Sequence, residues 1–194
     1  MPDLSALTQR WQGGDERAAE AIYNHHREAT FRLAYGLLGD VGEAEEVAQD
    51  ALNYALAHIS HYDTGRASFA TWLHTITVSR CRDRQRRRWL PTFSLIQWLQ
   101  WGQDAPDPAP TPERHAVQAE TYSEVWLAVQ NLSPQLREAI LFRYWADHTY
   151  QEMAVILNCP LRTAQSRVRL AFDRLRVALA PADFINHFEE ERAQ

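Results

Sequence analysis

Lysine is absent from this sequence of 194 residues, and all 20 of its basic residues are arginine. Cysteine is scarce: Cys81 and Cys159 are too few for a disulfide framework or a four-cysteine zinc site. No apolar run approaches the roughly 20 residues that span a bilayer. The start of the chain, MPDLSALTQRWQGGDE, lacks the basic first part and the apolar core of a signal peptide. We therefore expect a reduced, cytoplasmic protein with no membrane insertion.

Motifs of common enzyme classes are also missing. There is no P-loop, no dinucleotide-binding glycine motif and no H-E-x-x-H zinc motif. His58, His61 and His74 are a weak hint of a metal site, because no acidic or cysteine ligand lies at a matching spacing. The sequence therefore predicts no enzyme, no metal and no cofactor.

Charge is unevenly spread along a chain of net charge -5. Residues 15–63 hold ten carboxylates and three arginines, whereas residues 65–89 hold seven arginines and one aspartate and include RDRQRRR. A solvated helix C-terminus would account for two or three of these arginines. Six arginines in nine residues are more typical of a phosphate-binding patch. An acidic surface next to a basic one indicates a second, basic partner besides nucleic acid.

Helical periodicity predicts an all-α protein, because no segment alternates apolar and polar residues as a strand does. Residues 22–37 and 44–59 carry apolar stripes, and a third stripe begins at Phe69, with Ser68 as its cap. Gly39-Asp40 ends the first of these helices. Five of the nine prolines lie in residues 91–112, which predicts an extended linker. Within it, SLIQWLQW, with Trp98 and Trp101, either packs on the first bundle or docks on a partner.

Residues 133–178 carry the signals of a helix-turn-helix. Ser133-Pro134 starts one helix, Thr149 and Glu152 form a capping box for the next, and Asn158 ends it before Pro160. The last helix has an apolar face, namely Ala164, Val168, Ala171, Leu175 and Ala178. Its polar face is Arg162, Gln165, Ser166 and Arg169. Such a helix fits a DNA major groove, although an ordinary helical hairpin would show the same pattern.

These residues resemble a known family. LSPQLREAILFRYWADHTYQEMAVILNCPLRTAQSRVRLAFDRLR resembles region 4 of sigma-70 transcription initiation factors, in the extracytoplasmic-function form. FRLAYGLLGDVGEAEEVAQDALNYALAHI and SFATWLHTITVSRCRDRQRRR are similar to region 2 of the same family. The resemblance covers about residues 15–178 and implies two small helical domains: a region 2 bundle at 1–90 and a region 4 helix-turn-helix at 113–180, joined by the linker 91–112 and followed by a tail at 181–194.

Four positions depart from the family pattern. Ser79 stands where the family usually has the asparagine that is associated with reading a base of the -10 element. Arg162 replaces a usual glycine, Ala164 a usual valine, and Gln165 a common lysine or arginine. The promoter preference of this chain is therefore expected to differ from the common pattern at both elements.

The resemblance also implies partners and roles. The partners are RNA polymerase core, through the clamp helices of its largest subunit and its flap region, and promoter DNA. The expected polymerase contacts are Glu46, Gln49, Asp50 and Tyr54. The expected -10 contacts are Phe69, Trp72, Ser79, Arg80, Arg84, Arg87 and Arg88, together with the loop 61–68. The expected -35 contacts are Arg162, Thr163, Gln165, Ser166, Arg167 and Arg169.

Several alternatives stay open. Phe69 and Trp72 could stack on unpaired bases or belong to the core. Cys81, among arginines, could be a redox-sensitive thiol or a small buried residue. A free-standing helix-turn-helix regulator that binds an operator as a dimer, or a sigma-like decoy, would share part of the pattern. Many relatives are held inactive by an anti-sigma factor between the two domains, which makes such a protein a candidate partner.

The tail carries its own pattern. In PADFINHFEEERAQ, Phe184, Ile185 and Phe188 form one short apolar stripe ahead of three glutamates. The segment either docks as a short helix that weakens binding to free DNA, or is a frayed terminus.

Overall fold

The computed structural model describes residues 4–89 and 118–179, with side chains for 4–87 and 124–179, and within these ranges the elements are all helical. The expected all-α class is confirmed. The linker segment with Trp98 and Trp101, the tail and the side chain of Arg88 lie outside the described residues. No helix within the described ranges combines the length and the apolar character needed to cross a membrane.

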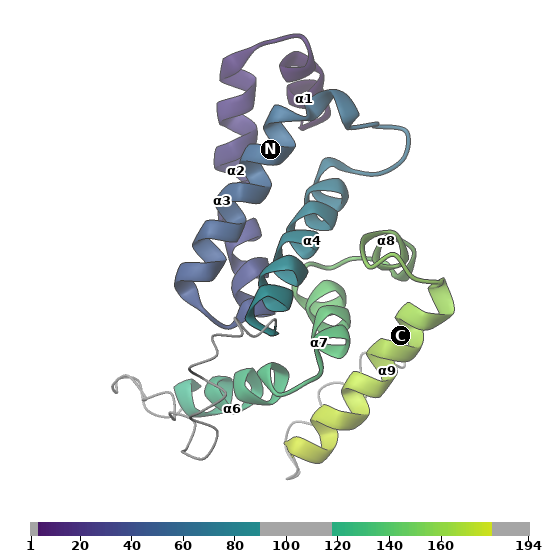
Figure 1. Ribbon diagram of the computed structural model, residues 1–194. Helices are drawn as coiled ribbons and strands as arrows, with labels where there is room; N and C mark the ends of the chain where they lie inside the picture. Colours follow the sequence, from purple (N-terminus) through teal and green to yellow (C-terminus); the bar gives the residue numbers. More distant parts are fainter. Residues whose placement is uncertain (1–3, 90–117, 180–194) are drawn as a thin grey trace, which may run out of the picture.

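The N-terminal unit is a bundle of four α-helices and one short turn (Figure 1). In order these are α1 (Leu4–Gln12), α2 (Glu16–Leu38), α3 (Val41–Ala57), the 3-10 turn η1 (Ile59–His61) and α4 (Phe69–Trp89). The expected stop and start signals are present: Gly39 ends α2 with φ 73°, and the Thr71 N–H donates to Ser68 Oγ over 3.1 Å. The short connection at Gly39-Asp40 returns α3 antiparallel to α2, and α4 packs against both helices (Figure 1).

The first helix, α1, was not predicted. Nine residues make a marginal helix in water, so tertiary contacts must hold it. Trp11 Nε1 donates to the Leu56 carbonyl over 3.0 Å, and Gln12 Nε2 donates to the carbonyls of Ile59 and Tyr62. The end of α3 and the turn that follows it therefore anchor the N-terminal helix.

The C-terminal unit holds the predicted helix-turn-helix. Its elements are α6 (Gln118–Gln130), α7 (Pro134–Ile140), the π-helical turn η2 (Leu141–Trp145), α8 (Tyr150–Ile156) and α9 (Leu161–Ala178). The Thr149–Glu152 capping box is confirmed, and Asn158 adopts the expected left-handed conformation with φ 50°. Ser133 occupies the cap position of α7 with Pro134 after it, but its side chain makes no capping bond.

The π-helical turn η2 is the other unpredicted element. The Ala146 N–H reaches back to the Leu141 carbonyl over 2.9 Å, and Asp147 then takes a positive φ of 51°. The His148 N–H bonds the Phe142 carbonyl over 2.9 Å, which closes the turn. The wide turn and the left-handed residue reverse the chain before α8 and direct His148 into the interior.

Two cores stabilise the molecule. One lies inside the N-terminal unit and is built around Ile22, Leu52 and Leu73. The other runs through both units, so that Leu33 and Leu37 of α2 share a core with Phe142 and Met153 of the C-terminal unit. Burial of the facing sides of α2 and α7 stabilises the contact between the two units, by about 25 cal/mol for each Å² of apolar surface removed from water.

The buried face of α9 is shorter than predicted. Ala164, Val168, Ala171 and Leu175 are buried as expected. Ala178 is exposed, so the buried stripe ends at Leu175, about one turn before the end of the helix.

Polar contacts cross between the units next to the shared core. The Arg82 guanidinium donates two hydrogen bonds of 2.7 Å to the Glu138 carboxylate. At the end of α2, the Gly36 carbonyl accepts from Gln130 over 2.9 Å, and the Leu37 carbonyl accepts from Arg137 over 3.0 Å. A Cβ at Gly36 would meet Leu141 Cδ1 at 3.0 Å, so the glycine permits this close approach.

The Arg82–Glu138 pair leads to an asymmetric prediction. The Glu138 side chain is 6% exposed and the Arg82 side chain 39%. We expect Arg82→Met to lower the free energy of unfolding by about 3 kcal/mol, because it leaves a carboxylate buried without its cation. Glu138→Gln should cost only about 1 kcal/mol, since the amide oxygen still accepts one bond and Arg82 reaches water. Urea unfolding followed by circular dichroism measures both, and equal losses would contradict this assignment.

Candidate functional site

The expected polymerase contacts lie together on α3. Glu46, Gln49, Asp50 and Tyr54 are all exposed, and their spacing of three to four residues places them on one face of the helix. Tyr54 stacks on His58 with ring centroids 4.0 Å apart. The result is an acidic strip with one ordered aromatic ring at its C-terminal end, which suits a basic protein surface.

The arginines of α4 are divided among different neighbours. Arg84 forms ion pairs with Glu43 and Glu46 of α3. The Arg80 guanidinium lies over the Tyr54 ring, 5.0 Å from its centroid. The structure therefore brings two expected -10 contacts against two expected polymerase contacts, and the two surfaces adjoin.

The other arginines of α4 also have different neighbours. Arg82 is committed to Glu138 of the C-terminal unit, and Arg86 pairs with Asp83 on α4 itself. Ser79 and Arg87 are exposed. The arginines of α4, which the sequence presents as one candidate phosphate-binding patch, are thus partly engaged in ion pairs within the chain.

The first turns of α4 carry an aromatic cluster. Phe69 is 4% exposed and lies in the N-terminal core, as the alternative above had it. Trp72 is half-buried, with its ring centroid 5.4 Å from that of Tyr62 and 5.7 Å from that of Phe69. Trp72 is therefore the more accessible of the two expected stacking residues in this conformation.

The polar face of α9 is presented as the sequence predicts. Arg162, Gln165, Ser166 and Arg169 are exposed, whereas Thr163 and Arg167 are half-buried at its edges. Nη1 of Arg167 is buried and has no hydrogen-bond partner within the described part of the chain. The exposed row is a reading face of suitable width for one groove.

A residue missed in the sequence lies beside this row. Arg143 of η2 lines a shallow hollow of about 270 Å³ with Thr149, Tyr150, Gln151, Leu161 and Gln165. Its guanidinium lies over the rings of Tyr144 and Tyr150, 5.6 and 5.5 Å from their centroids. These aromatic contacts hold one cation next to Gln165. In the sequence, the only signal was a single arginine within the apolar stretch ILFRYW.

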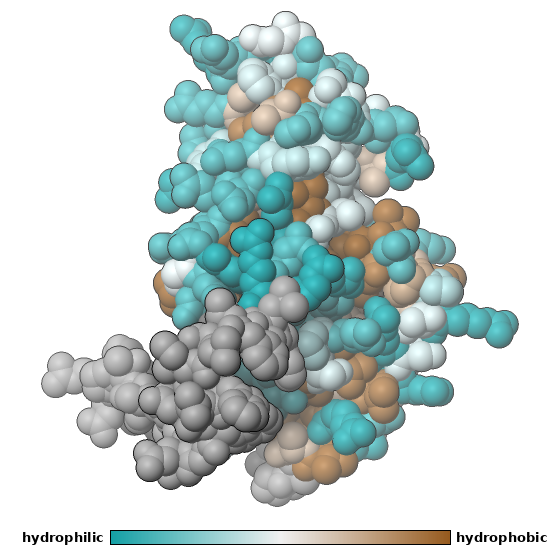
Figure 2. Space-filling model, in the orientation of Figure 1, coloured by the Kyte–Doolittle hydropathy of each residue, from teal (hydrophilic) through white to brown (hydrophobic). Residues whose placement is uncertain are grey.

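Exposed apolar residues gather on the C-terminal unit. Figure 2 shows hydrophobic surface at the level of α8 and along α9, whereas the surface over α2 and α3 is mostly hydrophilic. The exposed large apolar residues of the C-terminal unit are Leu127, Tyr144, Trp145, Val155, Leu161, Leu170 and Val177.

Neither the metal nor the redox alternative gains support from the geometry. Among the described residues, no three His, Cys, Asp or Glu side chains are grouped as ligands of a metal ion. Cys81 is 2% exposed, and burial, with Glu138 and Glu43 nearby, raises the pKa of its thiol to about 12. A thiol that stays protonated and buried is not a reactive one.

Comparison with known proteins agrees with this layout. Residues 22–90 match the family described as Sigma-70 region 2, and residues 122–175 match Sigma-70, region 4. The ECF RNA polymerase sigma factor RpoE of Cereibacter sphaeroides is 34% identical over 170 residues, which cover 80% of this chain and 90% of that protein. ECF RNA polymerase sigma factor SigW of Bacillus subtilis is 28% identical, with 86% and 91% covered.

Solved structures show the same fold. The sigma factor RpoE from Bartonella quintana, solved with the anti-sigma factor NepR, superposes with a TM-score of 0.64 at 25% identity and covers 82% of this chain and 95% of that one. CnrH, solved with the cytosolic domain of CnrY, gives a TM-score of 0.65 at 21% identity, with 90% and 95% covered. A free-standing operator-binding regulator is not favoured, since it would not need a region 2. The chain belongs to the extracytoplasmic-function (ECF) branch of the sigma-70 family, whose members are transcription initiation factors that bind RNA polymerase core and direct it to promoters.

Proposed function

We propose that α3 binds polymerase core, that α4 with the loop 61–68 holds the -10 element, and that α9 reads the -35 element. The observation that carries this assignment is the exposed row Arg162, Gln165, Ser166 and Arg169, opposite a buried stripe on the same helix. The protein acts by binding and not by catalysis, in the cytoplasm, where polymerase and chromosome are. The units at 1–90 and 113–180, the linker 91–112 and the tail 181–194 are its functional divisions.

The adjoining surfaces of α3 and α4 support a sequence of binding. Exposed ion pairs contribute only about 0–1 kcal/mol, so a basic polymerase surface can take over Glu46 at little cost. Arg84, which pairs with Glu43 and Glu46 in the free protein, then loses one of its two carboxylates and can turn toward a phosphate. Polymerase binding thus prepares the DNA contact at Arg84.

An anti-sigma factor is a further proposed partner. The similar sigma factor RpoE of Bartonella quintana was solved in complex with the anti-sigma factor NepR. In this chain the surface between α4 and α8 is filled by the chain's own packing. A protein that binds between the units must therefore displace Glu152 from Thr71 and Glu138 from Arg82.

The polymerase surface can be tested by charge reversal. Glu46→Arg with Asp50→Arg should abolish association with core polymerase, because like charges in an interface cost several kcal/mol. The fold should persist, since both side chains are exposed. Titration of labelled protein with core gives the affinity, and Glu45→Arg, an equally exposed reversal on the same helix, is the matched control. Unchanged affinity in the double variant would remove this surface from the assignment.

The reading face can be tested with Ser166→Ala plus Arg169→Ala. Loss of a base contact typically costs about 1–3 kcal/mol, so the holoenzyme should lose preference for its -35 sequence over a scrambled one. The promoter is first selected from a library by the wild-type holoenzyme, and run-off transcription then compares the two templates. Arg174→Ala removes one exposed arginine outside the row and serves as control. Equal loss on both templates would show that the row contacts phosphates only.

A further inference from the structure

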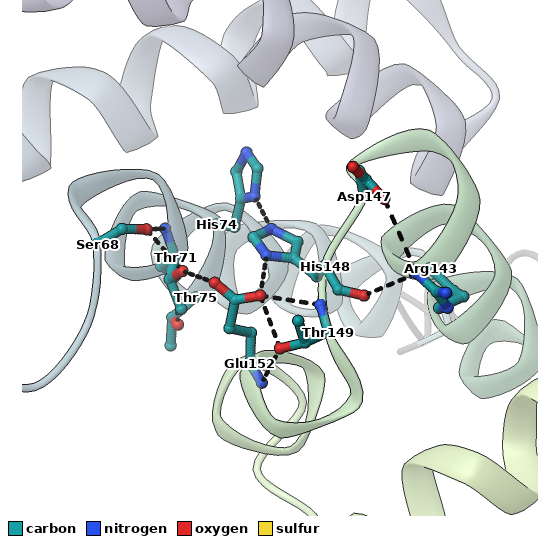
Figure 3. Close-up of polar contacts among 9 residues, drawn as sticks. All are labelled: Ser68, Thr71, His74, Thr75, Arg143, Asp147, His148, Thr149 and Glu152. Atoms are coloured by element: carbon teal, nitrogen blue, oxygen red, sulfur yellow. Dashed lines mark hydrogen bonds and ion pairs between the residues drawn. The ribbon is translucent and has the colours of Figure 1, made fainter.

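Two buried histidines meet where the helix-turn-helix contacts α4. Nδ1 of His74 on α4 and Nε2 of His148, in the turn before α8, are 2.7 Å apart, and the two rings lie almost perpendicular (Figure 3). The residues are 7% and 5% exposed. The contact joins the two units through groups that titrate near neutral pH.

A hydrogen bond between two ring nitrogens requires one N–H and one lone pair. At least one of the facing nitrogens must therefore be unprotonated. Two imidazolium rings in this position would direct N–H against N–H, with two positive charges in a site that excludes water. The contact consequently holds only while at least one of the rings is neutral.

The surroundings offer few negative charges to compensate. His26 of α2 lies close enough to His74 to oppose its protonation, and Glu152 of α8 approaches the pair as a counter-charge, with its Oε2 3.6 Å from His148 Nδ1. Glu152 already accepts bonds from the Thr149 N–H and hydroxyl and from the Thr71 hydroxyl.

The other charged groups nearby are turned outwards. Asp147 is almost fully exposed and faces Arg143 at 3.8 Å. The Arg143 guanidinium donates to the His148 carbonyl, at 3.5 Å, and not to its ring. The two paired imidazoles therefore share one neighbouring carboxylate, Glu152, which is already well bonded.

The pKa values follow from this arrangement. Burial, followed by His148 and His26, lowers the pKa of His74 to about 3, against a smaller opposing effect of Glu152. Burial also lowers the pKa of His148, and Glu152 opposes this change. Once the units separate, both rings return to an ordinary pKa near 6.5. The separated state thus binds more protons, so the closed state is most favoured above about pH 6.5 and loses that advantage as the pH falls toward the lowered values.

We propose that His74 and His148 form a proton-sensitive latch, which holds α8 against α4 while it is neutral and releases the C-terminal unit on acidification. Release uncovers the start of α4, where Thr71 now contacts Glu152, and lets the -10 and -35 faces move apart. The functional meaning of release rests on the proposed function, but the latch itself does not.

The expected size follows from linkage. Between about pH 7.5 and about pH 5, His74, whose pKa is lowered to about 3 in the closed state, shifts the ratio of open to closed protein about 30-fold once it is free to take up a proton. His148, whose pKa is also lowered, adds a further shift in the same direction.

Energy transfer between two dyes on the full chain tests the latch. Glu45→Cys on α3 and Asp173→Cys on α9 provide exposed attachment points in a Cys159→Ser background, and the buried Cys81 does not react. Transfer should fall between about pH 7.5 and about pH 5 while far-ultraviolet circular dichroism stays helical. Constant transfer, or a loss of helicity together with transfer, would overturn the proposal.

Variants identify the sensor. His74→Gln with His148→Gln replaces both rings by amides that bond each other but take up no proton, so its transfer should not depend on pH. If that variant does not fold, His74→Gln alone should reduce the response about 30-fold. His25→Gln, an exposed histidine, should respond like the wild type. A double variant, or that single variant, that opens like the wild type would overturn the latch. The measurement uses neither polymerase nor DNA, and transcription at about pH 7.5 tests the proposed function separately.

Discussion

Carbonyl groups at the end of α2 need hydrogen-bond donors, and this need ties the two helical units together. The last four carbonyls of a helix have no partner within the helix. Here the Gly36 carbonyl is bonded by Gln130 and the Leu37 carbonyl by Gln85 and Arg137, so two of the three donors come from the C-terminal unit. Gly36 also lets Leu141 approach the backbone closely. The same contact supplies donors to the free carbonyls at the end of α2 and packs Leu141 into the shared core.

Burial decides which of the ion pairs in this chain can be exchanged. Glu46 is 68% exposed, so water or another protein can replace it beside the half-buried Arg84 at little cost. Glu138 is buried, so its pairing with Arg82 can be given up only when the units separate and water enters. A buried carboxylate of this acidic chain thus holds one arginine of α4 firmly, whereas an exposed carboxylate holds another only loosely.

Glu152 serves two purposes at once. Its carboxylate completes the capping box with Thr149, which starts the first helix of the helix-turn-helix. The same carboxylate accepts a bond from Thr71 and approaches the buried histidine pair (Figure 3). A residue placed by a local rule thus becomes part of the interface, because the π-helical turn and Asp147 direct the capped end toward α4.

The sequence by itself determined the helices, their caps and the polar row on α9, because these depend on residues within about four positions of one another. It did not show α1, the π-helical turn or the end of the buried stripe before Ala178, since these depend on distant partners. The division of the arginines was decided only by the tertiary structure. Arg82 and Arg84 have the same chemistry, but two residues along a helix turn a side chain through about 200°, so one faces Glu138 and the other Glu46.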